Sequence, residues 1–357
     1  MTTEDKYINI RVGGRLVRNC INTKFTVIGM TILLLSLINS CNPNKEQMYR
    51  ETRLSLYTVV TVTVYSNSKQ KATEAVDSTF KELDRLGKLL NFYSEDSEVS
   101  MINRNAGVKP VKVSNETLEV IDKALSISKS TDGAFDITIG PIVKLWDFEK
   151  QILPDEKSIK EKLKLVGYKN VIVDKARSTV FLQKKGMQID LGGIEKGYTV
   201  DRAVNLLKQN GITAGIIAVG GEVKPFGIKP DGAPWKVGIK NPHQKGKEDD
   251  IFAIVNLTGK AISTSGGYQK FFVKDGKWYH HILNPATGYP AYECQSVSVI
   301  ADDAPDGYPT GIFVLDPQKG MEVLRKLGLD GVIMDKKGEV FITEGIKDKV
   351  RYIHNEQ

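Results

Sequence analysis

The feature of this sequence that most restricts its fold is a series of strand-forming runs joined by tight turns. Residues 58–65 consist of valine, threonine and one tyrosine and predict a strand, because β-branched residues favour extended backbone. Residues 271–279 hold Asp275-Gly276 between two strand-like runs, a dipeptide typical of a hairpin turn. Since hairpins join antiparallel strands, we predict an α+β fold with a largely antiparallel sheet and packed helices.

The remaining elements follow from hydrophobic periodicity. Further strands are predicted at residues 171–174, 179–183, 215–219, 235–239, 251–257, 296–301, 331–335 and 339–343. Helices are predicted at residues 69–90, 114–125, 155–164 and 318–327, and another from about residue 306. The 357 residues would allow two domains, but no repeat or clear linker follows residue 50, so we expect one catalytic unit.

The N-terminal segment predicts export. Residues 25–38 are apolar, follow several basic residues and precede Ser40-Cys41. A membrane-spanning helix needs about 20 apolar residues, so this shorter run indicates a signal peptide. Ser40-Cys41 resembles a bacterial lipoprotein processing site. We therefore expect a signal peptide at residues 1–40, lipid on Cys41, a tether at 41–53 and a membrane-anchored lipoprotein that faces the periplasm. An uncleaved N-terminal anchor is the alternative.

Charge and cysteine content narrow the function classes. The net charge of +7 is small for this length, and no basic run is interleaved with aromatic residues, so nucleic-acid binding is not expected. Cys20 lies in the predicted signal peptide and Cys41 would carry lipid, which leaves Cys294 unpaired. We therefore expect no internal disulfide and no structural zinc site.

A glycine turn at Gly192-Gly193 is a candidate phosphate site. It follows a predicted strand ending near Asp190 and precedes a helix that carries Lys196 and stops at Gly211. A helix start places backbone N–H groups and a positive dipole end together, which suits an anion. A tight strand-to-helix connection without any ligand is the alternative.

The residues best suited to chemistry lie in the C-terminal half. Of His280 and His281, only one can face a given site in a strand, which favours a single acid–base histidine over a metal pair. Asp306 and Thr310 are four residues apart at a helix start, so their oxygens can share a face and bind Mg²⁺ beside a phosphate. A surface histidine pair and an N-cap aspartate are the alternatives.

Six motifs in order resemble the ApbE family of FAD:protein FMN transferases, many of which are lipoproteins. They occupy residues 133–141, 190–198, 219–221, 263–266, 281–288 and 306–310, within a resemblance spanning residues 54–345. The resemblance implies a single T-fold-like catalytic domain at residues 54–347, followed by a tail at 348–357. It also implies Mg²⁺-dependent transfer of FMN from FAD to a threonine or serine of an acceptor protein, such as a membrane redox subunit, with release of AMP.

The resemblance also implies roles for individual residues. Asp306 and Thr310 match the family's metal ligands, with the backbone carbonyl of Glu195 as a third, and His281 matches the general base. The residues implied to contact FAD or line its pocket are Tyr93, Lys196, Asp201, Gly221, Thr264 and Ser265. The chain departs from the family pattern at Tyr57, Glu195 and Pro309. An FAD pyrophosphatase and a non-catalytic flavin-binding lipoprotein are the alternative functions.

Overall fold

The computed structural model describes residues 45–242 and 250–353. The predicted signal peptide, Ser40 and Cys41 lie outside these residues. Within the described ranges, the helices are too short or too polar to span a membrane. From Glu46 onward the described residues form one compact unit.

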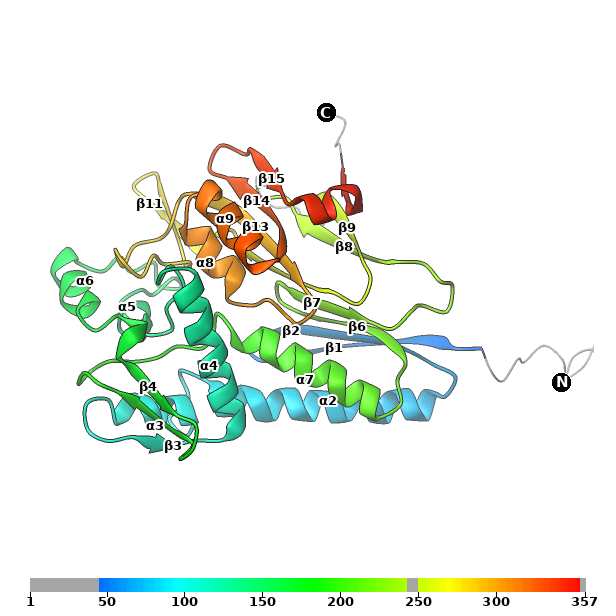
Figure 1. Cartoon of the computed structure of the whole chain (residues 1–357), viewed down its shortest axis with the longest axis horizontal. Helices are drawn as coiled ribbons and strands as arrows, with labels where there is room; N and C mark the ends of the chain where they lie inside the picture. The colour runs from blue at the N-terminus through cyan, green and yellow to red at the C-terminus, as the bar shows by residue number, and fades with distance from the viewer. Residues whose placement is uncertain (1–44, 243–249, 354–357) are drawn as a thin grey trace, which may run out of the picture. The chain divides into compact units, whose positions relative to one another are not determined.

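An antiparallel sheet of eight strands organises the described residues (Figure 1). Its order is β1-β2-β6-β7-β10-β13-β14-β15, and every neighbouring pair is antiparallel. The strands are β1 (Gln47–Ser55), β2 (Thr58–Ser66), β6 (Ala214–Val219), β7 (Glu222–Phe226), β10 (Ala261–Gly266), β13 (Cys294–Ala301), β14 (Asp330–Asp335) and β15 (Val340–Ile342). The predicted antiparallel α+β architecture is therefore confirmed.

Helices cover one face of this sheet. Successive side chains of a strand point to opposite faces, so every second residue packs against these helices. Val60, Val62 and Val64 of β2 pack under α2 (Lys69–Leu90) and α7 (Glu195–Gln209). Val297 and Val299 of β13 pack under α8 (Tyr308–Val314) and α9 (Pro317–Leu327). Figure 1 shows α2 and α7 side by side beneath β1, β2, β6 and β7.

A smaller sheet covers the opposite face. It has the order β16-β9-β8, with β8 (Trp235–Lys240), β9 (Ile251–Leu257) and β16 (Val350–Tyr352), and the turn η2 (Glu344–Lys349) leads into β16. Trp235 and Val255 pack there against Ile262 and Ile300 of the large sheet. The central strands of the eight-stranded sheet are thus covered by helices on one side and by strands on the other, whereas Met48 and Leu54 of β1 are exposed.

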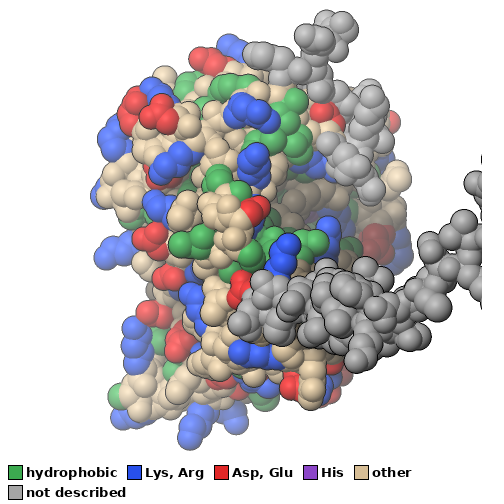
Figure 2. All heavy atoms as spheres, turned by 90° about the vertical axis from the view of Figure 1, so that its right-hand side faces the viewer, with side chains coloured by type: hydrophobic (Ala, Val, Ile, Leu, Met, Phe, Trp, Pro, Cys, Tyr) green, Lys and Arg blue, Asp and Glu red, His purple; other side chains and the backbone are tan. Residues whose placement is uncertain are grey.

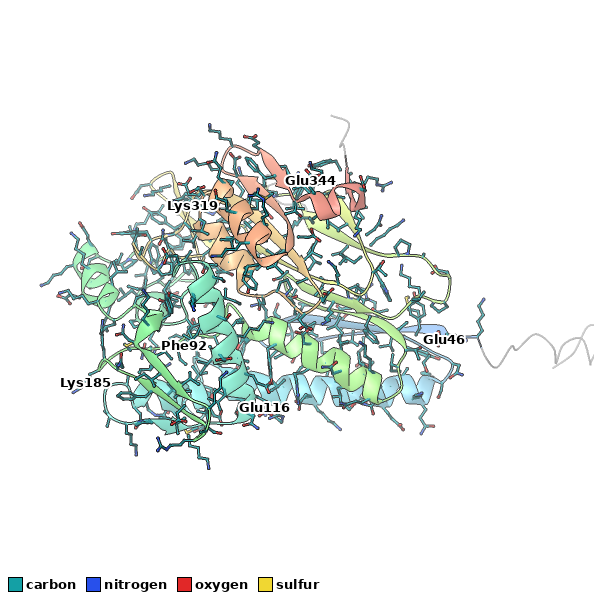
Figure 3. The ribbon with its side chains drawn as sticks, viewed as in Figure 1. Glu46, Phe92, Glu116, Lys185, Lys319 and Glu344 are labelled. Carbon is teal, nitrogen blue, oxygen red and sulfur yellow. The ribbon has the colours of Figure 1, made fainter. Side chains whose placement is uncertain are left out.

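A helical insertion lies between α2 and α7. It contains α3 (Glu98–Arg104), α4 (Asn115–Ser130), α5 (Gly140–Val143), α6 (Glu156–Leu163), η1 (Tyr168–Asn170) and a small sheet of β3 (Val111–Lys112), β5 (Thr179–Leu182) and β4 (Val171–Asp174). Ser97, Ser114 and Asp155 cap the helices that follow them. Figure 3 shows Phe92 inside this part of the molecule, where it is buried, whereas Lys185, Lys319 and Glu344 are exposed.

A separate hairpin, β11 (Phe271–Lys274) and β12 (Lys277–His280), completes the described residues. Asp275 and Gly276 form its turn with φ of 51° and 71°, as the sequence predicts. Figure 2 shows Lys and Arg side chains interspersed with Asp and Glu side chains on the uncovered part of the face it draws, in keeping with the small net charge.

Several segments differ from the sequence prediction, beginning with the two ends of the domain. Residues 47–53, predicted as tether, belong to β1, because all nine residues of that strand pair with β2. The predicted strand before Gly192 is only a single bridge between Ile139 and Gln188. Residues 350–352 of the predicted tail form β16. β1 is mostly polar and lacks the apolar alternation by which a strand is recognised in sequence, and β16 has only three residues, too few to show such a pattern.

Candidate active site

One cavity of about 790 Å³ brings together most of the residues singled out from the sequence. It lies against the helical face of the large sheet and is bordered by the insertion, the start of α7, β10 and the loops before α8. Nine of the ten predicted site residues line it, namely Tyr93, Glu195, Lys196, Gly221, Thr264, Ser265, His281, Asp306 and Thr310. The remaining one, Asp201, is considered separately below.

Asp306 and Thr310 form one polar corner of this cavity. Asp306 is only 5% exposed, and its Oδ2 accepts a hydrogen bond of 3.1 Å from the backbone N–H of Gly197. Thr310 stands in the first turn of α8, where its Oγ1 lies 3.0 Å from Oγ of Ser265. Helix α8 begins at Tyr308, two residues later than predicted, with Gly307 as N-cap at φ 95°. Pro309 fits its first turn, where no backbone donor is needed.

Lys196 lies beside this corner among acidic groups. Its Nζ donates to the carbonyl oxygen of Gly192 at 2.6 Å and lies 3.9 Å from Oδ2 of Asp306. Burial lowers the pKa of Lys196, but the carboxylates of Asp306, Glu195, Glu222 and Asp190 outweigh it, so the net pKa is raised. Lys196 therefore stays charged and is suited to hold an anion next to Asp306.

The pKa of Glu195 is also raised, which for a carboxyl group favours the neutral form. Burial raises the pKa of its side chain to about 7, with Lys196 opposing and Asp190 and Asp306 adding to the rise. This part of the cavity thus holds more carboxylate than the single ammonium can neutralise. A further cation or a protonated carboxyl is needed to balance it.

His281 is the base candidate that faces the cavity. Its Nδ1 donates to the carbonyl oxygen of Lys270 at 3.2 Å, which leaves Nε2 as the ring nitrogen with a free lone pair. Burial, together with smaller contributions from the nearby His280, Lys196 and Lys270, lowers the pKa of His281 to about 4. The imidazole is therefore neutral and able to accept a proton at neutral pH.

His280 occupies the other side of the strand, as alternation requires. It is 4% exposed, its Nε2 donates to the carbonyl oxygen of Ala291 at 2.6 Å, and its Nδ1 accepts from the backbone N–H of Ile282 at 3.3 Å. Burial lowers its pKa to about 4. His280 is a satisfied core residue, and the prediction that only one histidine of the pair serves the cavity agrees with this geometry.

Aromatic side chains also line the cavity. They are contributed by Tyr57, Phe92, Tyr93, Trp146 and Phe148. Tyr57 sits in the two-residue turn between β1 and β2, in which Leu56 and Tyr57 both have positive φ, of 52° and 58°. Non-glycine residues rarely adopt this backbone, and here the turn is held by burial of Leu56 and by a 2.5 Å hydrogen bond from Asn91 to the Tyr57 hydroxyl. These aromatic side chains suit a flat aromatic ligand.

Asp201 lies on α7 outside the cavity lining. Both of its carboxylate oxygens accept from the backbone N–H of Ala304 at 3.2 Å, and one of them pairs with Lys224. Lys123 also binds this loop, through the carbonyl oxygen of Ala304 at 2.7 Å. Asp201 thus anchors the loop that presents Asp306, and its contact with FAD stays a prediction.

Glu222 is a cavity residue that the sequence pattern did not single out. It is 1% exposed, and neither of its carboxylate oxygens has a hydrogen-bond partner among the described residues. Burial raises its pKa well above the usual range, and Asp306 adds to this. Glu222 would have been found had β7 and β10 been recognised as strands, since it pairs with Ser263 on the helical face.

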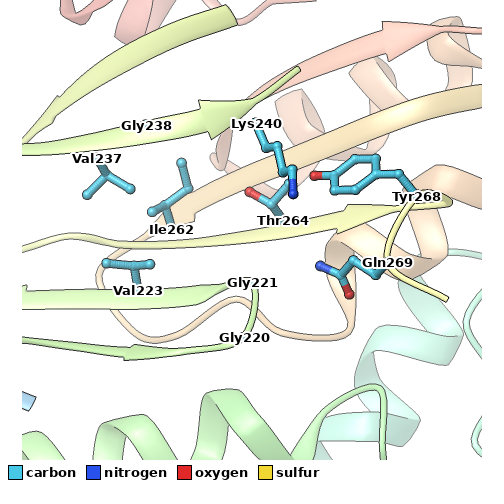
Figure 4. Close-up of a pocket in the computed structure, with 10 residues that line it drawn as sticks. All are labelled: Gly220, Gly221, Val223, Val237, Gly238, Lys240, Ile262, Thr264, Tyr268 and Gln269. Carbon is cyan, nitrogen blue, oxygen red and sulfur yellow. The ribbon is translucent and has the colours of Figure 1, made fainter. Parts of the chain in front are cut away.

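A second hollow of about 320 Å³ adjoins the first on the opposite face of the sheet (Figure 4). It is lined by apolar Val223, Val237 and Ile262 and by the polar ends of Lys240 and Gln269. Gly221, Thr264 and Gln269 border both hollows. A side chain at Gly221 would come within 2.4 Å of the carbonyl oxygen of Thr264, so only glycine fits this boundary.

Comparison with known proteins places the chain in a family. The sequence model of the ApbE family matches residues 56–333, most of the chain. The chain belongs to the ApbE family. An FAD:protein FMN transferase of Treponema pallidum is 32% identical over 349 residues, which cover 91% of this chain and 95% of that protein.

Solved ApbE structures share the fold. The ApbE protein of Thermotoga maritima has a TM-score of 0.79 at 35% identity and covers 85% of this chain and 100% of its own. The flavinyl transferase ApbE of Pseudomonas stutzeri has a TM-score of 0.74 at 27% identity, covering 85% and 97%. The family resemblance and the expected ApbE fold are therefore confirmed.

The oxygen atoms at the polar corner fit the magnesium ion that the ApbE resemblance implies. Among residues 45–242 and 250–353, no three His, Cys, Asp or Glu side chains are grouped to hold a metal by themselves. Mg²⁺ does not need such a group, because it is usually held by one or two carboxylates together with substrate phosphates and water. The polar corner meets that requirement with the carboxylate of Asp306 and the hydroxyl of Thr310. The surplus negative charge around Lys196, to which the carboxyl group of Glu222 contributes, favours a cation there as well.

Proposed function

We propose that this chain is a Mg²⁺-dependent FAD:protein FMN transferase, which moves FMN from FAD to a threonine or serine of an acceptor protein and releases AMP. The observation that carries the proposal is that His281, with Nε2 able to accept a proton, lines the same cavity as the Asp306–Thr310 corner. The cavity volume of about 790 Å³ lies in the upper part of the range found for ligand sites, about 300–1,000 Å³.

The cavity offers separate surroundings to the parts of FAD. Its aromatic lining residues Tyr57, Tyr93 and Trp146 suit the isoalloxazine ring by stacking. Its polar part, with Lys196 and the N-terminus of α7, suits the diphosphate, because a charged ammonium and helix dipole stabilise anions. Asp306 and Thr310 would hold the Mg²⁺, and the ion there would neutralise phosphate oxygens as a Lewis acid.

His281 supplies the proton transfer. The acceptor hydroxyl gives its proton to Nε2 of His281 while its oxygen forms a bond to the phosphorus of the FMN half. The bond from that phosphorus to the bridging oxygen breaks, and AMP leaves with the electron pair. General-base assistance of this kind contributes about 10²–10⁴-fold, and positioning of the hydroxyl against the phosphorus contributes more.

Hydrolysis is the competing reaction, because water in place of the acceptor hydroxyl would give free FMN and AMP from the same site. The test is to incubate the purified chain with FAD, Mg²⁺ and an acceptor protein. Flavin fluorescence on the denatured acceptor together with AMP supports transfer. Free FMN with an unlabelled acceptor supports the pyrophosphatase, and intact FAD supports binding alone.

We also propose that the mature protein is a lipoprotein, anchored through Cys41 and facing the periplasm. The proposal is supported by the apolar run at residues 25–38 and by Ser40-Cys41 directly after it. Acyl chains contribute about 0.8 kcal/mol per buried methylene, so several of them would hold the protein firmly. Cells fed a labelled fatty acid should label the protein but not its Cys41→Ala variant, and absence of label on the unaltered protein, or equal label on both, would contradict the proposal.

A further inference from the structure

The loop that presents Asp306 has no secondary structure of its own. It comprises residues 302–306, between the end of β13 and Gly307, the N-cap of α8, and we call it the Asp306 loop. Its last three residues are nevertheless buried. A ligand-binding side chain has to be held to within about 0.5 Å of its working position, and a loop does this only when groups outside it fix its backbone.

Ala304 is the residue at which the Asp306 loop is held. Its backbone N–H donates to both carboxylate oxygens of Asp201 on α7 at 3.2 Å, and its carbonyl oxygen accepts from Nζ of Lys123 on α4 at 2.7 Å. Because Ala304 is fully buried, both of its backbone groups need partners, and both partners here are charged. Hydrogen bonds to charged groups are about twice as strong as those between neutral groups. The backbone is thus fixed two residues before Asp306.

A buried lysine holds Asp201 in its turn. Lys224 of β7 is only 8% exposed, and its Nζ pairs with one carboxylate oxygen of Asp201 and lies 3.6 Å from Oδ1 of Asp303. Lys123, Asp201 and Lys224 line neither hollow. The Asp306 loop is therefore tied to α4, α7 and β7 by charged side chains that lie behind the cavity wall.

We propose that Lys123, Asp201 and Lys224 are positioning residues for the metal corner, which hold Ala304 and thereby keep the carboxylate of Asp306 where Mg²⁺ and the diphosphate of FAD bind. The inference rests on the proposed transferase function. It gives Asp201 a role other than contact with FAD, because both of its carboxylate oxygens already accept hydrogen bonds from Ala304 and one of them also pairs with Lys224. Neither lysine lies in the six sequence motifs, so their role follows from the fold alone.

Lys123 gives the cleanest test, because the sign of the effect separates position from charge. Lys123→Met keeps an unbranched side chain but removes the donor to Ala304, whereas Lys123→Arg keeps a charged donor. Loss of a positive charge would by itself favour a bound cation, so weaker metal binding reports the displaced loop. Lys129→Met, at an exposed lysine of the same helix, is the matched control. Lys123 is half-buried, so its replacement leaves the core intact.

Two readouts are compared for each variant. The affinity for FAD is measured by quenching of flavin fluorescence, once with Mg²⁺ and once with EDTA, and the ratio of the two affinities is the gain that the metal provides. This readout needs no turnover. The Mg²⁺ concentration for half-maximal transfer is measured separately, and urea unfolding checks that each variant is folded.

We expect Lys123→Met to lower the Mg²⁺-dependent gain in FAD affinity by about tenfold or more and to raise the half-maximal Mg²⁺ concentration by a similar factor. Its FAD affinity in EDTA should stay unchanged. Lys123→Arg should restore most of the gain, and Lys129→Met should match the unaltered chain. Asp201→Asn should likewise keep its FAD affinity in EDTA.

Three results would overturn the inference. The first is a Lys123→Met variant that matches Lys129→Met in Mg²⁺ dependence. The second is an equal loss of FAD affinity with Mg²⁺ and with EDTA in Lys123→Met or Asp201→Asn, which would mean direct contact with FAD or general damage. The third is an unaltered chain whose FAD affinity does not depend on Mg²⁺. Absence of transfer by the unaltered chain, with Mg²⁺-dependent FAD binding intact, would contradict the proposed function instead, so the two failures are distinguishable.

Discussion

The contact between α7 and the Asp306 loop gives the sharpest test of the metal corner. A Cβ added to Gly197 would lie 2.5 Å from Cβ of Asp306 and 3.3 Å from Cβ of Ala304. Carbon atoms pack best at about 3.5–4.0 Å, so Gly197→Ala must push the Asp306 backbone away by about 1 Å. The same shift breaks the hydrogen bond from the Gly197 N–H to Oδ2 of Asp306.

Two magnitudes follow from this geometry. Overpacking of this kind costs about 1–3 kcal/mol of the free energy of unfolding, offset by about 1 kcal/mol because alanine favours a helix over glycine. A misplacement of about 1 Å at a catalytic group can lower the rate about 100-fold. We therefore expect Gly197→Ala to stay folded while kcat/KM for FAD falls by about 100-fold and the Mg²⁺ concentration for half-maximal rate rises.

Gly320→Ala is the matched control. Its Cβ would lie 2.7 Å from Cγ2 of Ile312 and 2.9 Å from Cδ1 of Ile333, in the core under α9. It should lower stability to a similar extent without changing the Mg²⁺ dependence. The assay is urea unfolding together with transfer rates across a Mg²⁺ titration. A Gly197→Ala variant that matches Gly320→Ala in Mg²⁺ dependence would refute the placement of the metal beside Asp306.

Three further predictions address single side chains. His281→Ala should lower turnover by about 10²–10⁴-fold while FAD still binds, as measured by flavin fluorescence quenching. Because the pKa of His281 is lowered to about 4, the unaltered enzyme should also keep its activity well below pH 6.5. Unchanged turnover would remove His281 from the mechanism. Asp306→Ala should abolish both activity and Mg²⁺ dependence, and full activity without metal would argue against its role. Glu222→Gln should raise the free energy of unfolding by about 1–3 kcal/mol at pH 8 without Mg²⁺, because the raised pKa of Glu222 makes the fold less stable as pH increases above the normal carboxyl pKa. The gain should disappear near pH 4 in urea unfolding, and an equal stability of both proteins at pH 8 would contradict it.

Local patterns in the sequence predicted the elements that carry their own signals. The helix at residues 69–90 has apolar residues at regular spacing and a serine cap, and α2 has these bounds. The hairpin at Asp275-Gly276 was predictable because its turn requires residues that accept positive φ. Asp306, Thr310 and His281 were identified by motif, and the structure brings them to one cavity.

The elements that were missed depend on tertiary pairing. Residues 261–266 look like a polar turn, yet they form β10 because β7 and β13 supply hydrogen bonds on both sides. Without β10, the sequence gives no reason to place Glu222 beside Ser263 or to see Ser265 reach Thr310. Leu56-Tyr57 breaks the usual preference for Asn-Gly in a two-residue turn, since burial of Leu56 stabilises a backbone that the local sequence disfavours.

The central claim is that Asp306 and Thr310 would bind a divalent cation together with the diphosphate of FAD. His281 would then lie next to the phosphorus of the FMN half, on the side from which the acceptor hydroxyl attacks. A crystal structure with FAD and Mn²⁺, located by its anomalous signal, measures this directly. We expect the ion at about 2.0–2.2 Å from the Asp306 carboxylate and the Thr310 hydroxyl, in contact with the diphosphate, with Nε2 of His281 facing the phosphorus of the FMN half. An ion bound away from both residues, or a diphosphate out of reach of His281, would contradict the account.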